Sequence, residues 1–381
     1  MRDAVIVQAV RTPVGKRNGG LSGVQPADLS AHVLTALVER SGIEPALVED
    51  VIWGCVGQVG EQAADIARSA VLGAGWPESV PGVTVDRQCG SSQQAVSFAA
   101  ASVVAGHYDV VVAGGVESMS RVPMGTSTAG QWPFGEGFRA RYGDNPPNQG
   151  IGAEMIADRW GFSRAQLDEF SLASHAKAAA AQDQGRFSAE IAAVTTPDGI
   201  KVEADEGVRR GSTMEKLAEL KPAFRPDGRI TAGNSSQISD GAAALLITTS
   251  EKAAELGLTP LVRVHTAVVT GDDPIIMLTG PIPATAKALA RSGLSIGDIG
   301  AFEVNEAFAS VPLAWLAETG ANPARLNSNG GAIALGHPLG GSGARLMTTL
   351  IHHMRANGLR YGLQTMCEGG GQANATILEL V

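Results

Sequence analysis

The chain has 381 residues, and its 29 Lys and Arg against 38 Asp and Glu give a formal net charge of −9. Its hydrophobic content of 44% and charged content of 18% are typical of a globular protein and exclude a disordered chain. The length predicts two or three domains, and the acidic balance argues against a nucleic-acid-binding protein, which needs a basic surface to displace counterions from phosphate.

Short apolar segments alternate with longer helical patterns, which predicts an α/β fold with a mostly parallel sheet. The first such segment, residues 4–10, reads as a buried strand and not as a signal peptide. No apolar run reaches the ~18 residues of a membrane span, so we expect a cytoplasmic protein without a membrane partner. The other predicted strands are residues 51–55, 84–86, 110–113, 242–248, 262–269, 301–304 and 363–366.

Cys89 lies in a polar, glycine-containing turn between a predicted strand and an apolar helix that ends at Gly106. Backbone N–H groups and the positive end of the helix dipole favour a thiolate there, which predicts a nucleophile at neutral pH. The alternative is an inert buried thiol, as free cysteines often are. The three cysteines (Cys55, Cys89 and Cys367) form no disulfide framework, and no Cys/His spacing predicts a metal site.

The segment from about residue 118 to residue 231 departs from the alternation of strands and helices. It contains loops rich in Pro, Gly and Arg at residues 132–147, followed by a helix whose start is marked by a capping box of Ser163 and Gln166. We interpret this segment as an insertion.

Three motifs with chemical potential follow in the last third of the chain. Asn305, just after a predicted strand, is either a helix N-cap or a group that orients a water or donates to an oxygen. His337 lies between a glycine and a proline, so we predict that it is the base for Cys89 and a donor to a substrate oxygen. Cys367 ends a strand ahead of three glycines, whose N–H groups can bind an oxyanion. The other histidines are interpreted as surface or helix residues: His32, His107, His175, His265, His352 and His353.

The two ends of the chain share an order of elements. Asp50 and Asp298 each precede a predicted strand, and 39 residues after each comes Cys89 or His337. A glycine-rich turn, a helix and a strand that ends in glycine follow in both cases. This agreement indicates an internal duplication in which the Cys89 and His337 loops are equivalent and face each other.

Four motifs, Cys-Gly-Ser at Cys89, Asn-Glu-Ala-Phe at Asn305, Gly-His-Pro at His337 and Cys-x-Gly-Gly-Gly at Cys367, resemble those of the thiolase family, the acetyl-CoA C-acyltransferases. The resemblance covers the whole chain and is greatest to actinobacterial degradative 3-ketoacyl-CoA thiolases of fatty-acid and steroid breakdown. It implies the thiolase fold, a duplicated five-layer α/β/α/β/α arrangement with an inserted loop domain. The implied division is an N-terminal half at residues 1–118 plus 240–258, a loop domain at 119–239 and a C-terminal half at 259–381.

The resemblance also implies a role for each reactive residue. Cys89, activated by His337, attacks the 3-keto carbonyl and becomes acylated. Cys367 protonates the departing enolate of acetyl-CoA (or propionyl-CoA) and then takes the proton of incoming CoA. Asn305 holds a water that forms one oxyanion hole with His337, and the N–H groups of Cys89 and Gly369 form the other. Two acyl transfers imply ping-pong kinetics, with coenzyme A as co-substrate and no tightly bound cofactor or metal.

By the same resemblance, coenzyme A lies on the insertion and the segment that follows it. Ser236 matches a loop that touches the pantetheine arm, Arg209 and Arg210 match a basic stretch near the nucleotide phosphates, and Gln149 is included among the contacts. The two arginines are equally compatible with a solvated basic pair. Biosynthetic acetoacetyl-CoA thiolases carry His-Met-Gly where this chain has Asn-Gln-Gly at residues 148–150, which predicts a longer or bulkier acyl group.

Several alternatives remain at this point. Condensation of two acetyl-CoA molecules on the same machinery predicts a small acyl pocket. A decarboxylating ketoacyl synthase of this fold has histidine in place of the second cysteine, which Cys367 contradicts. An NAD(P) oxidoreductase lacks the expected G-x-G-x-x-G between an early strand and helix, and a non-catalytic acyl-CoA-binding protein would have lost one of the reactive residues. We expect a homodimer or homotetramer that binds acyl-CoA and CoA.

Overall fold

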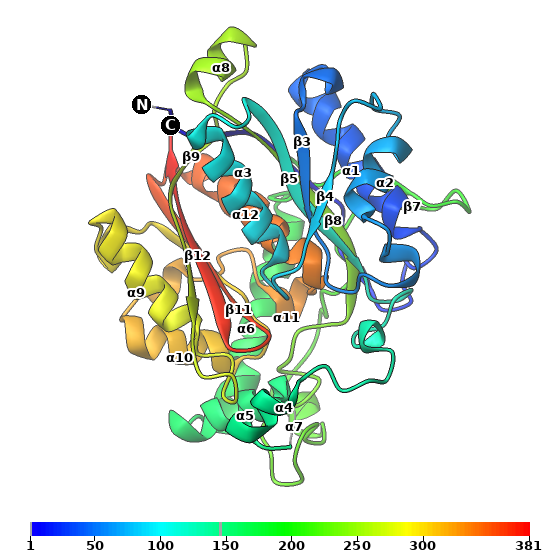
Figure 1. The fold of residues 1–381 in the computed structure, drawn as a ribbon. Coiled ribbons are helices and arrows are strands. Elements are labelled where there is room, and N and C mark those ends of the chain that lie inside the picture. Colours follow the sequence, from blue (N-terminus) through cyan, green and yellow to red (C-terminus); the bar gives the residue numbers. More distant parts are fainter. Residues whose placement is uncertain (1, 145–146) are drawn as a thin grey trace.

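The computed structural model describes residues 2–144 and 147–381. Two α/β halves share one sheet and lie on the right and left of Figure 1. The first half consists of β1 (Val5–Arg11), β2 (Gly15–Lys16), α1 (Pro26–Ser41), β3 (Asp50–Gly54), α2 (Ile66–Gly73), β4 (Val83–Val85), α3 (Ser91–Ala105), β5 (Val110–Ser118), β8 (Ser239–Thr248) and α8 (Ser250–Glu255). The second half consists of β9 (Val262–Gly271), α9 (Pro281–Ser292), β10 (Ala301–Val304), α10 (Ser310–Thr319), α11 (Ala332–Leu335), α12 (Leu339–Asn357), β11 (Tyr361–Glu368) and β12 (Gln372–Leu380).

The two halves repeat one strand order. The sheet has ten strands in the order β10-β11-β12-β9-β1-β8-β5-β3-β4, and β2 pairs with β8. Outward from the β1–β9 junction, the first half runs β1, β8, β5, β3 and the second runs β9, β12, β11, β10. In each half the first two of these pairings are antiparallel and the third is parallel. The predicted internal duplication is therefore confirmed.

The prediction of a mostly parallel sheet is wrong. Among the strands of the described residues, only β3–β4, β3–β5 and β10–β11 are parallel pairs. The reason is that the last strand of each half, β8 or β12, runs antiparallel to the strands on both of its sides. All eight predicted strands are present, but β12 was not among them. Its sequence, QANATILEL, begins with four residues of low strand propensity and has β-branched side chains only at Thr376 and Ile377, so it lacks the alternation of a typical strand.

The layers stack as α/β/α/β/α. Helices α1 and α2 cover the outer face of the first half, and α9 and α10 cover that of the second half (Figure 1). Helices α3 and α12 form the middle layer and share a core with both parts of the sheet. Gly343 of α12 permits their close approach, since a side-chain carbon at this position would lie 2.3 Å from the backbone nitrogen of Gln93 in α3. The packing of α3 against α12 thus sets the distance between the two loops that precede these helices.

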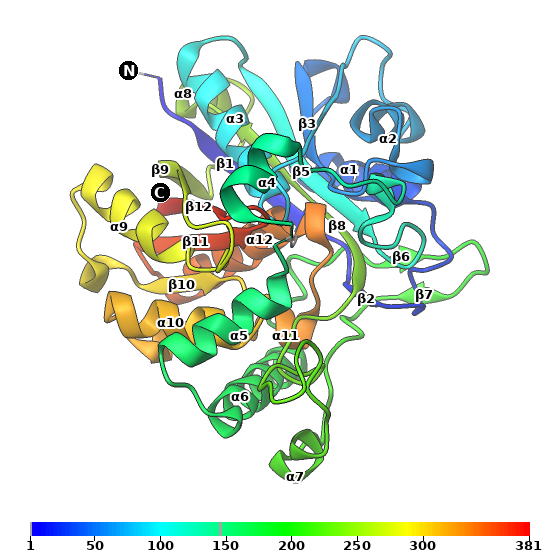
Figure 2. The same cartoon turned by 60° about the horizontal axis from the view of Figure 1, so that its bottom comes forward.

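The inserted segment lies at one end of the molecule. Figure 2 shows α5 beside α10, and α6 beside α11. The predicted capping box is confirmed, with Ser163 and Gln166 bonding each other's backbone at the start of α6. Within residues 2–144 and 147–381, we find no helix with the length and apolarity needed to cross a bilayer. The elements of the segment are α4 (Glu136–Tyr142), α5 (Gln149–Arg159), α6 (Arg164–Asp183), β6 (Val194–Thr195), β7 (Lys201–Val202) and α7 (Met214–Ala218).

Candidate active site

Cys89 lies immediately before α3, in a tight turn that follows β4. Gln88 has a left-handed backbone (φ 49°), which bends the chain sharply ahead of the cysteine. The turn is fixed by Ser91, whose hydroxyl accepts from the Arg87 N–H at 2.8 Å and donates to the Gln88 carbonyl at 2.6 Å. Cys89 is 5% exposed and packs against Met119 and the neighbouring apolar residues. The turn therefore holds the sulfur in one place at the helix N-terminus.

Burial works against a resting thiolate at this position. It is the larger cause of a Cys89 pKa raised to about 12, and a negative charge on Glu368 would act in the same direction. We expected the helix N-terminus to favour the thiolate, but removal of the sulfur from water outweighs that effect in the free protein. Cys89 is therefore a thiol at neutral pH, and a base must take its proton before it can attack.

His337 has the free nitrogen that such a base requires. Its backbone N–H is donated to the hydroxyl of Ser239, and its ring nitrogen Nδ1 lies 2.6 Å from the Ser342 hydroxyl. That hydroxyl donates its only proton to the Pro338 carbonyl at 2.8 Å, so it must accept the Nδ1–H of His337. The other nitrogen, Nε2, is then unprotonated. Burial, with the nearby charge of Arg345, lowers the pKa of His337 to about 3 and keeps the ring neutral.

Asn305 joins His337 at the site. Its Nδ2 lies 3.4 Å from His337 Nε2, and its buried Oδ1 has no hydrogen-bond partner within the described part of the chain. An unpaired buried carbonyl oxygen is a ready acceptor for a water or a ligand. The next residue, Glu306, accepts from Ser174, Asn327 and the Ile333 N–H. Glu306 thus ties the insertion to the loop that carries Asn305.

Cys367 approaches the same site from the end of β11. It is 1% exposed and packs among Met277, Phe308 and Ile333. Burial raises its pKa well above the ordinary value, and the charge of Cys89 acts in the same direction. The next residue, Glu368, lies directly beside Gly90, which follows Cys89. Gly369 follows in the turn to β12, packed against the Gln88 side chain. The predicted residues Cys89, His337, Asn305, Cys367 and Gly369 therefore come from four segments that converge.

Glu117 is a buried carboxylate that sequence reasoning missed. It lies at the end of β5 and accepts hydrogen bonds from the N–H groups of Val56 and Gly57 and from the Gln62 side chain. It also accepts from the Gly340 N–H at 2.8 Å, at the start of the helix that follows His337. One side chain thereby fastens a loop of the first half to the histidine loop of the second. A lone Glu in an apolar strand was the only signal in the sequence.

The proposed coenzyme A contacts are distributed unevenly. Ser236 and Arg209 line one pocket of about 650 Å³ together with Lys16 and Arg17. The backbone N–H of Arg209 is donated to His175 Nδ1 at 3.1 Å. His175 therefore helps to fix the backbone at Arg209, a role that the sequence did not suggest. Arg210 and Gln149 do not line that pocket. Arg210 is ion-paired on the surface with Asp183, and Gln149 begins α5.

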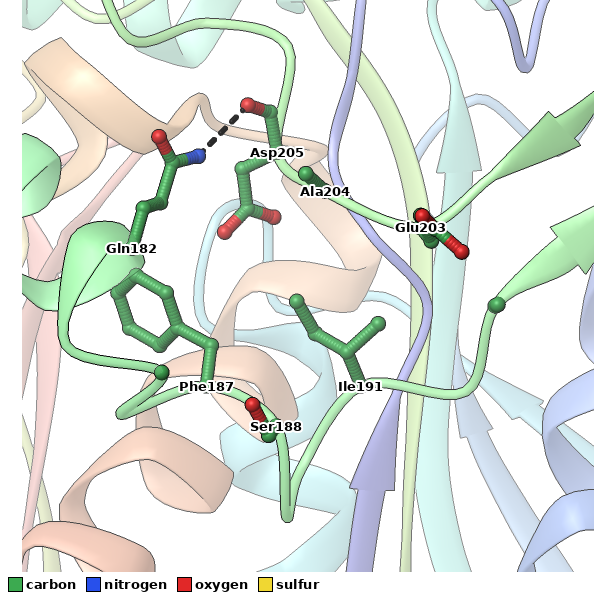
Figure 3. Close-up of a pocket in the computed structure, with 9 residues that line it drawn as sticks. Gln182, Phe187, Ser188, Ile191, Glu203, Ala204 and Asp205 are labelled. Carbon is green, nitrogen blue, oxygen red and sulfur yellow. Dashed lines mark hydrogen bonds between the residues drawn. The ribbon is translucent and has the colours of Figure 1, made fainter.

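A second pocket, of about 350 Å³, is lined by none of the predicted site residues. Figure 3 shows its wall, where the Gln182 amide donates to the Asp205 carbonyl at 2.9 Å. Asp205 and Glu203 make this pocket acidic, and the Asp205 carboxylate is already paired with the buried Arg11. A phosphate-bearing ligand is therefore disfavoured here and favoured in the basic pocket beside Ser236.

Comparisons with known proteins agree with this geometry. Family profiles described as "Thiolase, N-terminal domain" and "Thiolase, C-terminal domain" match residues 4–251 and 258–380. The chain is 50% identical to the steroid 3-ketoacyl-CoA thiolase FadA6 of Mycobacterium tuberculosis, covering 100% of this chain and 94% of that one. It is 46% identical to a 3-ketoacyl-CoA thiolase of Pseudoalteromonas translucida, with both chains fully covered. The crystal structure of Bacillus anthracis acetyl-CoA acetyltransferase superimposes with a TM-score of 0.92 at 39% identity, covering 100% and 99% of the chains.

Proposed function

The chain belongs to the thiolase family of acyltransferases and has the thiolase fold, and from this premise we propose that it cleaves a 3-ketoacyl-CoA with free CoA. The products are acetyl-CoA (or propionyl-CoA) and a shortened acyl-CoA. The proposal is supported by three buried groups on neighbouring segments: a thiol at Cys89, an unprotonated imidazole nitrogen at His337 and a second thiol at Cys367. Curated relatives that match the full chain are named 3-ketoacyl-CoA thiolases, which favours cleavage over condensation.

In the first half-reaction, we propose that His337 Nε2 takes the proton of Cys89 as the thiolate attacks the 3-keto carbon of the substrate. The carbonyl oxygen becomes an oxyanion, which hydrogen-bond donors at the site stabilise. The bond between C2 and C3 then breaks, and its electron pair leaves with the enolate of acetyl-CoA. Cys367 donates its proton to that carbanion, so acetyl-CoA departs and Cys89 is left as a thioester.

In the second half-reaction, the Cys367 thiolate takes the proton of the incoming CoA thiol. The CoA thiolate attacks the acyl carbon on Cys89, and the Cys89 sulfur leaves and recovers its proton from His337. The Cys89 proton returns from His337, and the CoA proton replaces the one that Cys367 gave to acetyl-CoA. All three residues therefore regain their starting protonation, and the cycle consumes no external acid or base. Asn305, with its free Oδ1, is proposed to hold the water that completes an oxyanion site with His337. Gly369 and the Cys89 N–H are proposed to form the other.

Arg209→Ala is expected to raise the KM for CoA by roughly tenfold with little change in kcat, because a phosphate contact contributes binding energy in both ground and transition states. Arg210→Ala is the matched control. Its guanidinium is engaged with Asp183 on the surface, so we expect its KM to stay within about twofold of the wild type. Steady-state thiolysis at varied CoA concentration measures both values. An equal effect of the two substitutions would contradict the assignment of Arg209 to the CoA site.

The rate of thiolysis is expected to rise with the size of the acyl group. The residues at 148–150 are Asn-Gln-Gly, without the His-Met pair of acetoacetyl-CoA thiolases, and one curated relative is named for steroid substrates. We therefore expect kcat/KM for long-chain and steroid-derived 3-ketoacyl-CoAs to exceed that for acetoacetyl-CoA by at least about tenfold. Side-by-side thiolysis assays test this expectation. Comparable or faster cleavage of acetoacetyl-CoA would indicate a short-chain thiolase.

Further features of the molecule are proposed on the same basis. We propose the domain division at residues 1–118 plus 240–258, 119–239 and 259–381, a cytoplasmic location, and a homodimer or homotetramer. The proposed reaction requires no metal or tightly bound cofactor, because the substrate's thioester supplies both the acidity of C2 and the leaving group.

A further inference from the structure

Glu368 has no role in the proposed reaction, yet it lies between the two reactive cysteines and the start of α3. It follows Cys367 at the end of β11 and is fully buried. A side-chain carbon on Gly90 would lie 2.0 Å from Glu368 Oε1 and 2.8 Å from the amide nitrogen of Asn374. Glycine at position 90 thus makes room for this carboxyl group directly beside the nucleophile.

The surroundings of the carboxyl group lack hydrogen-bond donors. Neither Glu368 side-chain oxygen has a partner in the part of the chain that the structure describes, and the same holds for the side-chain oxygen Oδ1 of Asn374. The Asn374 amide is already donated to the Gly90 carbonyl at 3.2 Å. Buried acceptors without donors are unfavourable, whereas a proton on the carboxyl group adds the missing donor. The local hydrogen-bond inventory therefore favours the neutral acid.

The charged neighbours permit the neutral form. Within the described residues, Arg87, in the loop before α3, is the cation whose charge acts on Glu368. Arg87 is half-buried, and its guanidinium donates to Gln372 Oε1 at 2.9 Å. Facing Glu368 from the other elements are Cys89 and Cys367, whose thiolates would repel a carboxylate. Burial raises the pKa of Glu368 to about 8 against the opposing effect of Arg87.

We propose that Glu368 is a positioning residue for the Cys89 nucleophile: it stays a protonated carboxylic acid during turnover, supplies the donor that the acceptors beside Gly90 lack, and keeps negative charge away from the Cys89 sulfur. The inference rests on the proposed function in that Cys89 is the attacking group. Ionisation of Glu368 places a second negative charge beside the thiolate, which disfavours the thiolate and slows its reactions.

The test is the pH dependence of Cys89 alkylation by iodoacetamide, measured on the full chain by mass spectrometry of the Cys89 peptide. We expect the wild-type and E368Q rates to agree within about threefold at pH 7. At pH 9.5 we expect E368Q to react roughly tenfold faster, because its Cys89 pKa is lower by about one. Glu303→Gln is the matched control. Glu303 is equally buried with a pKa raised to about 8, but its charge does not act on Cys89.

Three outcomes would overturn the proposal: superimposable alkylation profiles for wild type and E368Q, the same acceleration in E303Q, or a more than tenfold loss of thiolysis at pH 7 in folded E368Q. If E368Q does not fold, the pH dependence of the wild-type alkylation rate is the test. The proposal requires that this rate increase less steeply with pH above about pH 8, and a rate that continues to rise with the same slope contradicts it. Alkylation needs no acyl-CoA. Failure to cleave any 3-ketoacyl-CoA would therefore refute the proposed function separately from this inference.

Discussion

Cys89→Ala is expected to reduce thiolysis by roughly 10⁴-fold or more, because the substitution removes the only atom to which the acyl group can be transferred. The variant should fold normally, since the sulfur makes few polar contacts and alanine fits the same space. Incubation with an acyl-CoA followed by intact-mass measurement should reveal no acyl adduct. A Cys89→Ala protein with undiminished turnover would refute the proposed reaction.

Two further substitutions separate the roles of the cysteines. Cys367→Ala is expected to lose turnover but still to acquire an acyl group slowly from an acyl-CoA donor, because Cys89 and His337 remain in place. Cys55→Ala is the control. Cys55 is buried as deeply as the other two cysteines, and its pKa is raised by burial and by Glu117, but it has no proposed part in the reaction. We expect wild-type turnover and full acylation from it.

Glu117→Ala is expected to lower the free energy of unfolding by about 3 kcal/mol or more. The substitution leaves three N–H groups without their acceptor: those of the half-buried Val56 and Gly57 and that of the buried Gly340. Each unsatisfied donor that is shielded from water costs about 1 kcal/mol or more. The kcat should also fall, because the helix that follows His337 loses its anchor to the first half. Urea unfolding and thiolysis assays measure the two effects.

A surface carboxylate provides the comparison for Glu117. Glu61 is paired with Arg121, but both side chains are substantially exposed, and exposed ion pairs contribute about 0–1 kcal/mol. Glu61→Gln should therefore change stability little and leave kcat unaffected. If Glu117→Ala were no less stable than Glu61→Gln, the loop of residues 55–57 and the histidine loop would have to be held by contacts other than this carboxylate.

The sequence was most informative where local patterns carry local structure. Glycine after a helix predicted the end of α3 at Gly106, which has the left-handed backbone of a C-cap. Gly358 ends α12 in the same way. The capping box of Ser163 and Gln166 likewise depends only on neighbours within one turn. Equal spacing from Asp50 and Asp298 predicted the duplication, because a repeated order of elements persists in the sequence even when residues change.

The features that the sequence did not reveal depend on contacts between distant segments. Strand direction is one: β12 is antiparallel to its neighbours because a three-glycine turn reverses the chain, and no local pattern distinguishes that turn from a longer crossover. Protonation is another. The helix N-terminus at Cys89 suggested a thiolate, but the burial that opposes it comes from Met119, Leu339 and Met366, which lie far along the chain. Glu117 joins the two halves through a hydrogen bond to Gly340, a residue 223 positions away in the sequence.

The pairing of α3 with α12 has a consequence for how such proteins diversify. The nucleophile turn and the histidine loop each precede one member of this pair, and the pair is packed as tightly as Gly343 allows. The relative position of the nucleophile turn and the histidine loop is therefore set by the middle helical layer. It does not depend on the peripheral segment that contains α4 to α7. Mutations in that segment can change which molecules are accepted while the reaction centre is conserved. We expect lineages that descend from a common ancestor of this chain to differ mainly there, with new specificities arising without loss of the chemistry.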